Sequence, residues 1–266
     1  MNRIRVAHEA PISLLQRVQE VTDYDYALVH LFETHPQYFE FFKQSRQQGR
    51  DILLDNSLFE LGVAFDSAKF VQWIEKLQPS YFVVPDVLES GADTVSSFIT
   101  FIDEYTDLPS MHIGTVQGKN YAEIVECYRF MSDHADMIAL SFDLSYYMGS
   151  ALGDTKLQRQ MNGRIKLVND LIHDGIWNFN KPTHLLGAAL SREFSYYTQH
   201  GIEIYSCDTS NPVMAGLKGL RYSSKFGIQT KPTQKLVELI DHNVTNDEWD
   251  LIKFNIDNFR LNLSHA

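Results

Sequence analysis

Cysteine is scarce in this chain, which has 266 residues and only two cysteines, Cys127 and Cys207. Two cysteines are too few for the disulfide framework of a small secreted domain. They also cannot supply a cysteine-rich zinc site. The histidines do not replace them, because no H-x-H or H-E-x-x-H spacing occurs. The sequence therefore predicts a protein of a reducing compartment, with no catalytic metal and no other cofactor.

Long apolar runs are also missing. No stretch of 18 or more apolar residues occurs, so no helix is expected to span a membrane. The first nine residues, M-N-R-I-R-V-A-H-E, lack the apolar core of a secretory signal. We therefore expect a cytoplasmic protein without a membrane partner.

Positive charge is in deficit overall, since the formal net charge is −11. This balance argues against nucleic-acid binding by bulk attraction. The charge is unevenly distributed, however, because no acidic residue lies between Asp208 and Glu238. A basic stripe of this kind holds phosphates in some proteins and is a solvated loop in others. Its members are Lys218, Arg221, Lys225, Lys231 and Lys235.

The residues that are present alternate between apolar β-branched runs and amphipathic stretches, which is typical of a parallel sheet with crossover helices. The predicted strands are residues 26–31, 51–55, 81–85, 111–116, 137–141, 184–187 and 202–206, with an eighth near 221–226. Apolar residues at helical spacing predict helices over 68–77, 157–172 and 246–261.

The repeat length favours a barrel. Asp55 and Asp86 are 31 residues apart, as are Asp86 and Gln117, which is roughly one βα unit of a barrel. No G-x-G-x-x-G follows the first predicted strand, which disfavours a dinucleotide-binding open sheet. We predict a single α/β domain over residues 1–266, a TIM (β/α)8 barrel, with the helix over 246–261 packed on it.

Four polar residues stand at the ends of predicted strands. Asp55, Asp86 and Gln117 end three of them, and Asp208 comes just after a fourth. Catalytic groups of α/β barrels lie at the carboxyl ends of the strands, so this pattern predicts an enzyme. Each aspartate also has a purely structural interpretation, as a helix cap or a turn residue.

Five short motifs around these residues occur in a fixed order. They are D-N-S-L-F-E at 55–60, Asp86, G-T-V-Q-G at 114–118, H-L-L-G-A at 184–188 and D-T-S-N-P at 208–212. In this order they resemble the motifs of the tRNA-guanine transglycosylase superfamily of TIM barrels. Only the G-x-V-Q-G motif matches in full. The first motif lacks both family glycines and the glutamine, and A-L-S-F-D at 139–143 stands where the family has a Gly-Gly segment.

The chain also lacks the cysteines of the zinc subdomain that typical tRNA enzymes of this family carry. In this respect, and in length, it resembles the shorter members, some encoded by bacteriophages, that act on DNA. The resemblance implies a transferase that exchanges guanine in DNA for a 7-deazaguanine base, in the host cytoplasm if phage-encoded. Alternatives are the same exchange on tRNA, a carboxylate-dependent N-glycoside hydrolase, and a non-catalytic nucleic-acid-binding subunit. A homodimer is left open.

The resemblance and the chemistry of base exchange together assign the catalytic roles. A covalent intermediate divides the exchange into two easier steps, and a carboxylate suits attack at an oxocarbenium-like carbon. Asp208 is therefore predicted to be the nucleophile towards C1′ of the target nucleotide. Asp55 is predicted to be the general acid and base, because the leaving guanine needs a proton and the incoming base must lose one.

The remaining predictions concern binding. Asp86 is predicted to accept from the N1–H and the exocyclic amine of guanine, and Gln117 to donate to O6. Gly118 is predicted to allow close approach of the backbone, and Phe59 and Leu186 to sandwich the base. Gly187 is also predicted to belong to the substrate-binding site. Lys218 and Arg221 are predicted to hold the phosphates beside the target.

Overall fold

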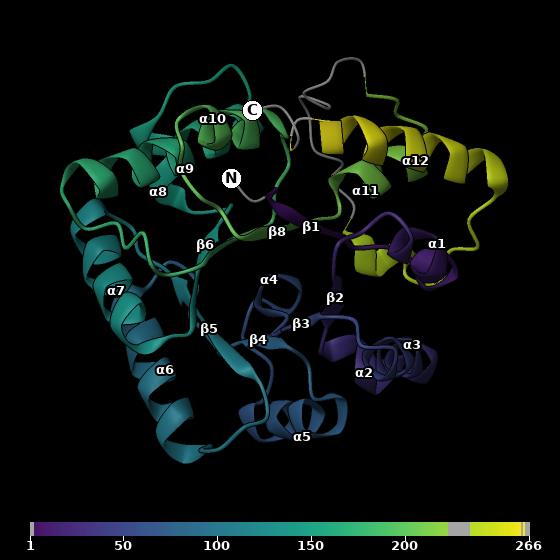
Figure 1. The fold of residues 1–266 in the computed structure, drawn as a ribbon, viewed down its shortest axis with the longest axis horizontal. Helices are drawn as coiled ribbons and strands as arrows, with labels where there is room; N and C mark the ends of the chain where they lie inside the picture. Colours follow the sequence, from purple (N-terminus) through teal and green to yellow (C-terminus); the bar gives the residue numbers. More distant parts are fainter. Residues whose placement is uncertain (1–2, 223–234, 262, 264–266) are drawn as a thin grey trace. The chain divides into compact units, whose positions relative to one another are not determined.

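The computed structural model of this protein describes residues 3–222, 235–261 and 263 (Figure 1). Within these residues, eight strands alternate with helices and form one parallel sheet in the order β1-β8-β7-β6-β5-β4-β3-β2. This is the strand content and alternation of an α/β TIM (β/α)8 barrel, so the predicted fold class is confirmed. No helix of the described residues has both the length and the apolar character needed to cross a bilayer.

The strands are short, and most lie where the sequence predicts them. They are β1 (Arg5–His8), β2 (Asp25–Leu28), β3 (Ile52–Asp55), β4 (Tyr81–Val83), β5 (Met111–Val116), β6 (Met137–Ser141), β7 (Thr183–Leu186) and β8 (Ser206–Thr209). Two strand predictions need correction. The strand predicted over residues 202–206 is instead β8, at Ser206–Thr209, so Asp208 lies within the strand and not just after it. The first strand, β1, was not predicted, whereas Arg221 and Tyr222 lie in no strand and residues 223–226 are outside the described residues.

The chain divides into two compact units, each described by itself. Unit 2 comprises residues 24–141 and 180–182, with strands β2 to β6 paired in parallel. Helix α5 illustrates why the helices of unit 2 form. Asp66 caps its start by accepting from the Lys69 N–H at 3.0 Å, and its apolar residues Phe70 and Ile74 are buried. The helices of this unit are α2 (His30–Thr34), α3 (Pro36–Gln47), α4 (Leu58–Leu61), α5 (Ser67–Leu77), α6 (Gly91–Glu104) and α7 (Tyr121–His134).

Unit 1 comprises residues 1–23, 142–179 and 183–266, and in it β8 pairs in parallel with both β1 and β7. Its larger helices include α9 and α12, and both confirm the helices predicted over 157–172 and 246–261. The helical elements are η1 (Ile12–Leu14), α1 (Leu15–Gln19), α8 (Ser145–Ser150), α9 (Lys156–His173), α10 (Arg192–Gln199), α11 (Asn211–Leu217), η2 (Leu236–Leu239) and α12 (Asn246–Leu261).

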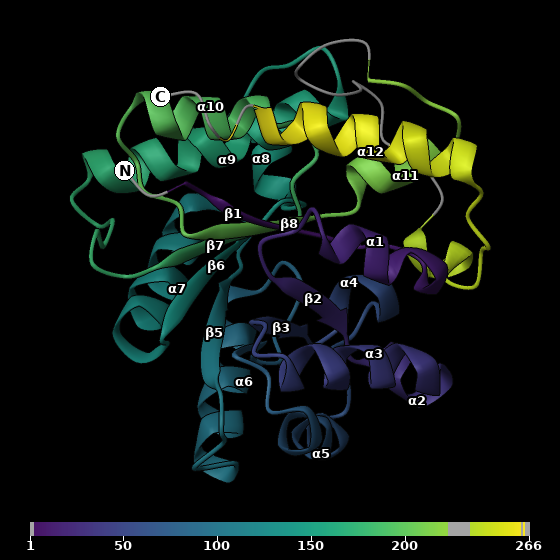
Figure 2. The same cartoon turned by 45° about the vertical axis from the view of Figure 1, so that its right-hand side comes forward.

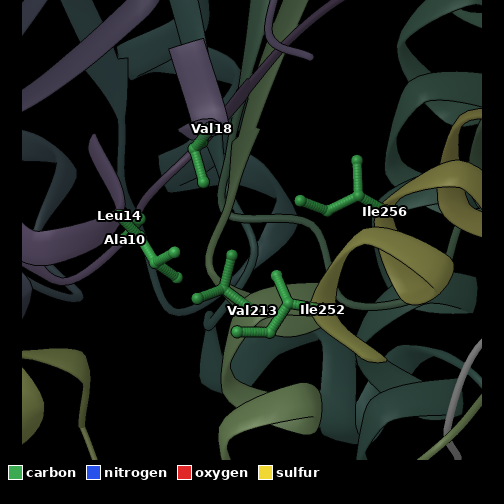
Figure 3. Packing of buried hydrophobic residues seen from close by; sticks show 6 residues of the cluster. All are labelled: Ala10, Leu14, Val18, Val213, Ile252 and Ile256. Carbon is green, nitrogen blue, oxygen red and sulfur yellow. The ribbon is translucent and has the colours of Figure 1, made fainter. Parts of the chain in front are cut away.

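Helix α12 lies beside α11, as both views of the ribbon show (Figure 2). The apolar face predicted for it is buried, because Ile252, Ile256 and Phe259 are fully enclosed. Part of this face belongs to a cluster that joins α12 to α11, α1 and the segment after β1 (Figure 3). The helix near the C-terminus and the first residues of the chain therefore share one apolar core. The members of the cluster are Ala10, Leu14, Val18, Val213, Ile252 and Ile256.

His8, at the end of β1, is a buried polar residue that contacts helix α12. Its side chain is 5% exposed, and neither ring nitrogen has a hydrogen-bond partner among the described residues. The ring packs edge-on against Phe259, with 5.8 Å between the ring centroids. Burial lowers the pKa of His8 from 6.5 to about 3, although its contact with Thr209 opposes this. His8 is therefore uncharged in the folded protein at neutral pH.

This burial predicts a loss of stability in acid. Below pH 6.5 the unfolded chain binds a proton at His8 and the folded protein does not until about pH 3, so stability falls across that window. The expected loss from this one group is about 2 kcal/mol at pH 5. Urea denaturation at pH 7.5 and pH 5 measures it. His8→Phe should show a smaller loss than wild type, whereas the exposed His173→Gln should not. Equal losses in all three proteins would contradict the prediction.

Candidate active site

Three predicted site residues lie at neighbouring strand ends of unit 2. Asp55 is the last residue of β3, Asp86 follows β4, and Gln117 directly follows β5. The structure brings two of them into contact, because Gln117 donates from Nε2 to Asp86 Oδ2 at 2.8 Å. Asn56 donates from Nδ2 to the other carboxylate oxygen, Oδ1, also at 2.8 Å. The Asp86 carboxylate is thus clamped between two amides.

The clamp is buried, and this affects the charge of Asp86. Burial raises the pKa of Asp86, while the hydrogen bonds from Asn56 and Gln117 lower it and limit the rise. The Gln117 amide is fixed at its other end too, since its Oε1 accepts from the Glu89 N–H at 3.1 Å. One N–H of the Gln117 amide is thus committed to Asp86. The donation from Gln117 to O6 of a purine stays a prediction.

Asp55 is held by its own neighbours in unit 2. Tyr26 donates from its hydroxyl to Oδ2 at 2.5 Å, and the Ser57 N–H donates to Oδ1 at 2.8 Å. The second contact is an Asx turn, so the turn role considered from the sequence is present. Ser57 has a φ of 60°, a left-handed conformation that glycine adopts most easily. The motif that this segment resembles has glycine at that place.

The other predicted binding residues of unit 2 differ in surroundings. Phe59, on α4, is 47% exposed, so it is not enclosed in the core. Gly118 has a φ of 153°, and a Cβ placed on it would lie 2.9 Å from Ile124 Cγ1 and 3.0 Å from Ile124 N. Gly118 is therefore required for the close contact with the start of α7, whatever it does for a ligand.

Asp208, in unit 1, is buried within β8. Its Oδ1 accepts from the Gly187 N–H at 2.9 Å and lies 3.2 Å from His184 Nε2. Among the residues that the structure describes, no donor contacts Oδ2. The capping role considered from the sequence is absent, because helix α11 has no side-chain cap at its start and the turn is made by Thr209, whose Oγ1 accepts from the Asn211 N–H. Asp208 instead faces the end of β7.

The end of β7 contains the predicted Leu186 and Gly187, and a buried ion pair supports it. Arg164 of α9 and Glu193 of α10 are fully buried and form two charge-assisted hydrogen bonds, at 2.7 and 2.9 Å. Arg164 also donates to the backbone carbonyls of Leu186 and Gly187, at 3.2 and 3.0 Å. Burial acts to lower the pKa of Arg164, but the Glu193 carboxylate outweighs it and keeps the guanidinium charged.

Neither member of this pair was identified as a functional candidate from the sequence. The signal was present in the helix predicted over 157–172, because Arg164 lies on the same face as Met161 and Val168, which are buried. A charged side chain on the buried face of a helix requires a partner. The partner, Glu193, is 29 residues away in the sequence, so only the fold identifies it.

Only some of the basic residues after α11 are among the described residues. Lys218 and Arg221 are exposed, and the Arg221 guanidinium lies 3.5 Å from the ring centroid of Phe254 on α12. This cation–π contact fixes the arginine against the helix surface. Lys225 and Lys231 lie outside the described residues. The phosphate contacts of Lys218 and Arg221 stay predictions.

The fold defines a TIM-barrel protein with carboxylates at its strand ends. Within the described ranges, no group of three or more His, Cys, Asp or Glu side chains is placed to hold a metal ion. In comparisons with known proteins, no family model matches this chain and no curated protein matches it. The resemblance to the transglycosylases therefore depends on the five ordered motifs.

Proposed function

We propose that this protein is a guanine transglycosylase that exchanges guanine in DNA for a 7-deazaguanine base. The observation that carries the proposal is the environment of Asp208, a buried carboxylate at the carboxyl end of a barrel strand. One of its oxygens is anchored by two polar groups, and it serves no helix cap. Such a carboxylate is oriented for attack in the way that a retaining glycosidase uses its nucleophile.

The reaction assigned to these residues has two steps, each a displacement at C1′. Asp208 attacks C1′ as the C1′–N9 bond breaks, the bonding electron pair goes to N9, and Asp55 donates a proton to the leaving guanine. The incoming base then gives its proton to the Asp55 carboxylate, its N9 attacks C1′, and the electron pair of the C1′–O bond returns to Asp208. Each half inverts C1′, so the configuration is retained overall.

The amide clamp on Asp86 supports the recognition of guanine. Guanine presents two adjacent donors, N1–H and the exocyclic amine, whereas adenine has an acceptor at N1. A carboxylate held in one orientation by Asn56 and Gln117 is preorganised to accept from both donors. The sequence has no cysteine after Cys207 that could hold the zinc of the tRNA enzymes, and this supports DNA as the polymer.

The test is an exchange assay with DNA that contains radiolabelled guanine. Adding 7-cyano-7-deazaguanine should release the label from DNA and incorporate the new base. Release from tRNA alone would move the function to tRNA, and release without any added base would identify a hydrolase. No release from either polymer would overturn the proposal. The Asp257→Asn variant, changed on the surface of α12, is the matched control and should behave as wild type.

A further inference from the structure

Three buried side chains of unit 1 form a continuous hydrogen-bonded row on two neighbouring strands. His184 of β7 lies opposite Ser206 of β8 in the strand register, and its Nδ1 is 2.8 Å from Ser206 Oγ. Alternate residues of a strand face the same side, so Asp208 lies on the same side as Ser206. The other ring nitrogen, His184 Nε2, is 3.2 Å from Asp208 Oδ1.

The donor and acceptor atoms of these side chains determine the direction of hydrogen-bond donation along the row. A carboxylate oxygen only accepts, so the bond between His184 and Asp208 requires a proton on Nε2. In the neutral ring Nδ1 is then an acceptor, and the Ser206 hydroxyl donates to it. With a neutral ring the row runs from Ser206 through His184 to Asp208, and Ser206 selects the histidine tautomer that contacts the carboxylate.

Two donors consequently meet at one oxygen of Asp208. Oδ1 accepts from His184 Nε2–H and from the Gly187 N–H, whereas no described residue donates to Oδ2. We infer that His184 is a positioning residue for base exchange, which anchors Oδ1 so that Oδ2 is the oxygen that bonds to C1′. This inference rests on the proposed function.

The anchored oxygen has a defined part in the second half of the reaction. In the covalent intermediate Oδ2 forms the bond to C1′ and Oδ1 is the carbonyl oxygen of the ester. When the incoming base attacks C1′, the electron pair of the Oδ2–C1′ bond returns to the carboxylate, and charge spreads onto Oδ1. Hydrogen bonds to Oδ1 stabilise this developing charge. Loss of the His184 contact should therefore slow breakdown of the intermediate more than its formation.

A pair of amide substitutions separates this role from simple packing. In His184→Gln the amide nitrogen occupies about the place of Nε2 and keeps a donor for Asp208. In His184→Asn the shorter amide reaches only the position of Nδ1, so it keeps the Ser206 contact and loses the Asp208 contact. Both variants bury an amide at the same site.

The measurements are kcat, the KM for the 7-deazaguanine base, and the fraction of enzyme trapped covalently on DNA during turnover. We expect His184→Asn to lower kcat by about 10- to 100-fold, with KM within about twofold and a larger trapped fraction. His184→Gln should recover most of kcat and the wild-type trapped fraction. Wild-type kcat in the asparagine variant, or equal losses in both with an unchanged trapped fraction, would overturn the inference.

A substitute variant and the wild-type activity separate failure of this inference from failure of the proposed function. If His184→Asn does not fold, Ser206→Ala replaces it, since losing the tautomer-selecting donor should change kcat and the trapped fraction in the same direction. An unchanged Ser206→Ala enzyme would then overturn the inference. If wild type releases no guanine from DNA or tRNA, the proposed function has failed. Normal wild-type exchange with unaffected His184 variants would instead refute the positioning role alone.

Discussion

Asp208→Asn is expected to abolish base exchange, with a loss of kcat on the order of 10⁴-fold. Asparagine has the shape of aspartate, and its carbonyl oxygen still accepts from Gly187 N–H and His184. The amide nitrogen then takes the place of Oδ2 and has no lone pair available for attack at C1′. The substitution therefore removes the nucleophile while keeping the anchored oxygen.

Two measurements check this result. Release of labelled guanine reports turnover, and a denaturing gel of protein mixed with DNA reports the covalent adduct, which the variant should not form. The melting temperature of the variant should stay close to that of wild type, because both hydrogen bonds to Oδ1 are kept. A variant that retains more than about a tenth of the activity would exclude Asp208 as the nucleophile.

Arg164→Met should produce the largest loss of stability, about 3 to 5 kcal/mol. The substitution leaves the Glu193 carboxylate buried without its cation, and it removes the donors to the carbonyls of Leu186 and Gly187. Tyr197 still donates to Glu193 at 3.0 Å, but a single hydroxyl does not balance a buried charge. Urea denaturation at pH 7.5 measures the free energy of unfolding.

The control is an exposed ion pair of the same kind. Lys253 and Asp257 of α12 lie 2.6 Å apart on the surface, and Lys253→Ala should cost no more than about 0.5 kcal/mol. In the double variant Arg164→Met/Glu193→Leu neither charge remains, so part of the lost stability should return. Similar small effects of Arg164→Met and Lys253→Ala would show that the buried pair contributes little.

The sequence predicted the parts of the fold whose signals are local. Strands β5 and β6 coincide with the predicted ranges because most of their residues are apolar or β-branched, a signal that lies within the segment itself. Strand β8 was displaced because its sequence, S-C-D-T, is polar, and it is buried only through partners on other elements. Strand β1 was missed because it has four residues and pairs with a strand at the other end of the unit.

The same difference between local and long-range signals applies to the candidate site. Asp55, Asp86, Gln117 and Asp208 were found at or near strand ends, since that position depends on the pattern along the chain. Their partners were not found. Asn56 and Tyr26 contact carboxylates about 30 residues away, a distance at which sequence patterns carry no signal. The same applies to the contacts of His184 and Arg164, which only the folded chain brings together.

The pairing of β1 with β8 has a consequence for how the protein is made. Arg5 and Tyr205, whose side chains hydrogen-bond, are 200 residues apart. At a synthesis rate of about 5 to 20 residues per second, the first strand leaves the ribosome about 10 to 40 seconds before its partner exists. Unit 2 is nearly continuous in sequence and is complete in that interval. Until translation is almost finished, the first strand therefore lacks its sheet partner and has only contacts close in sequence, such as the backbone hydrogen bonds of Val6 with Asp23.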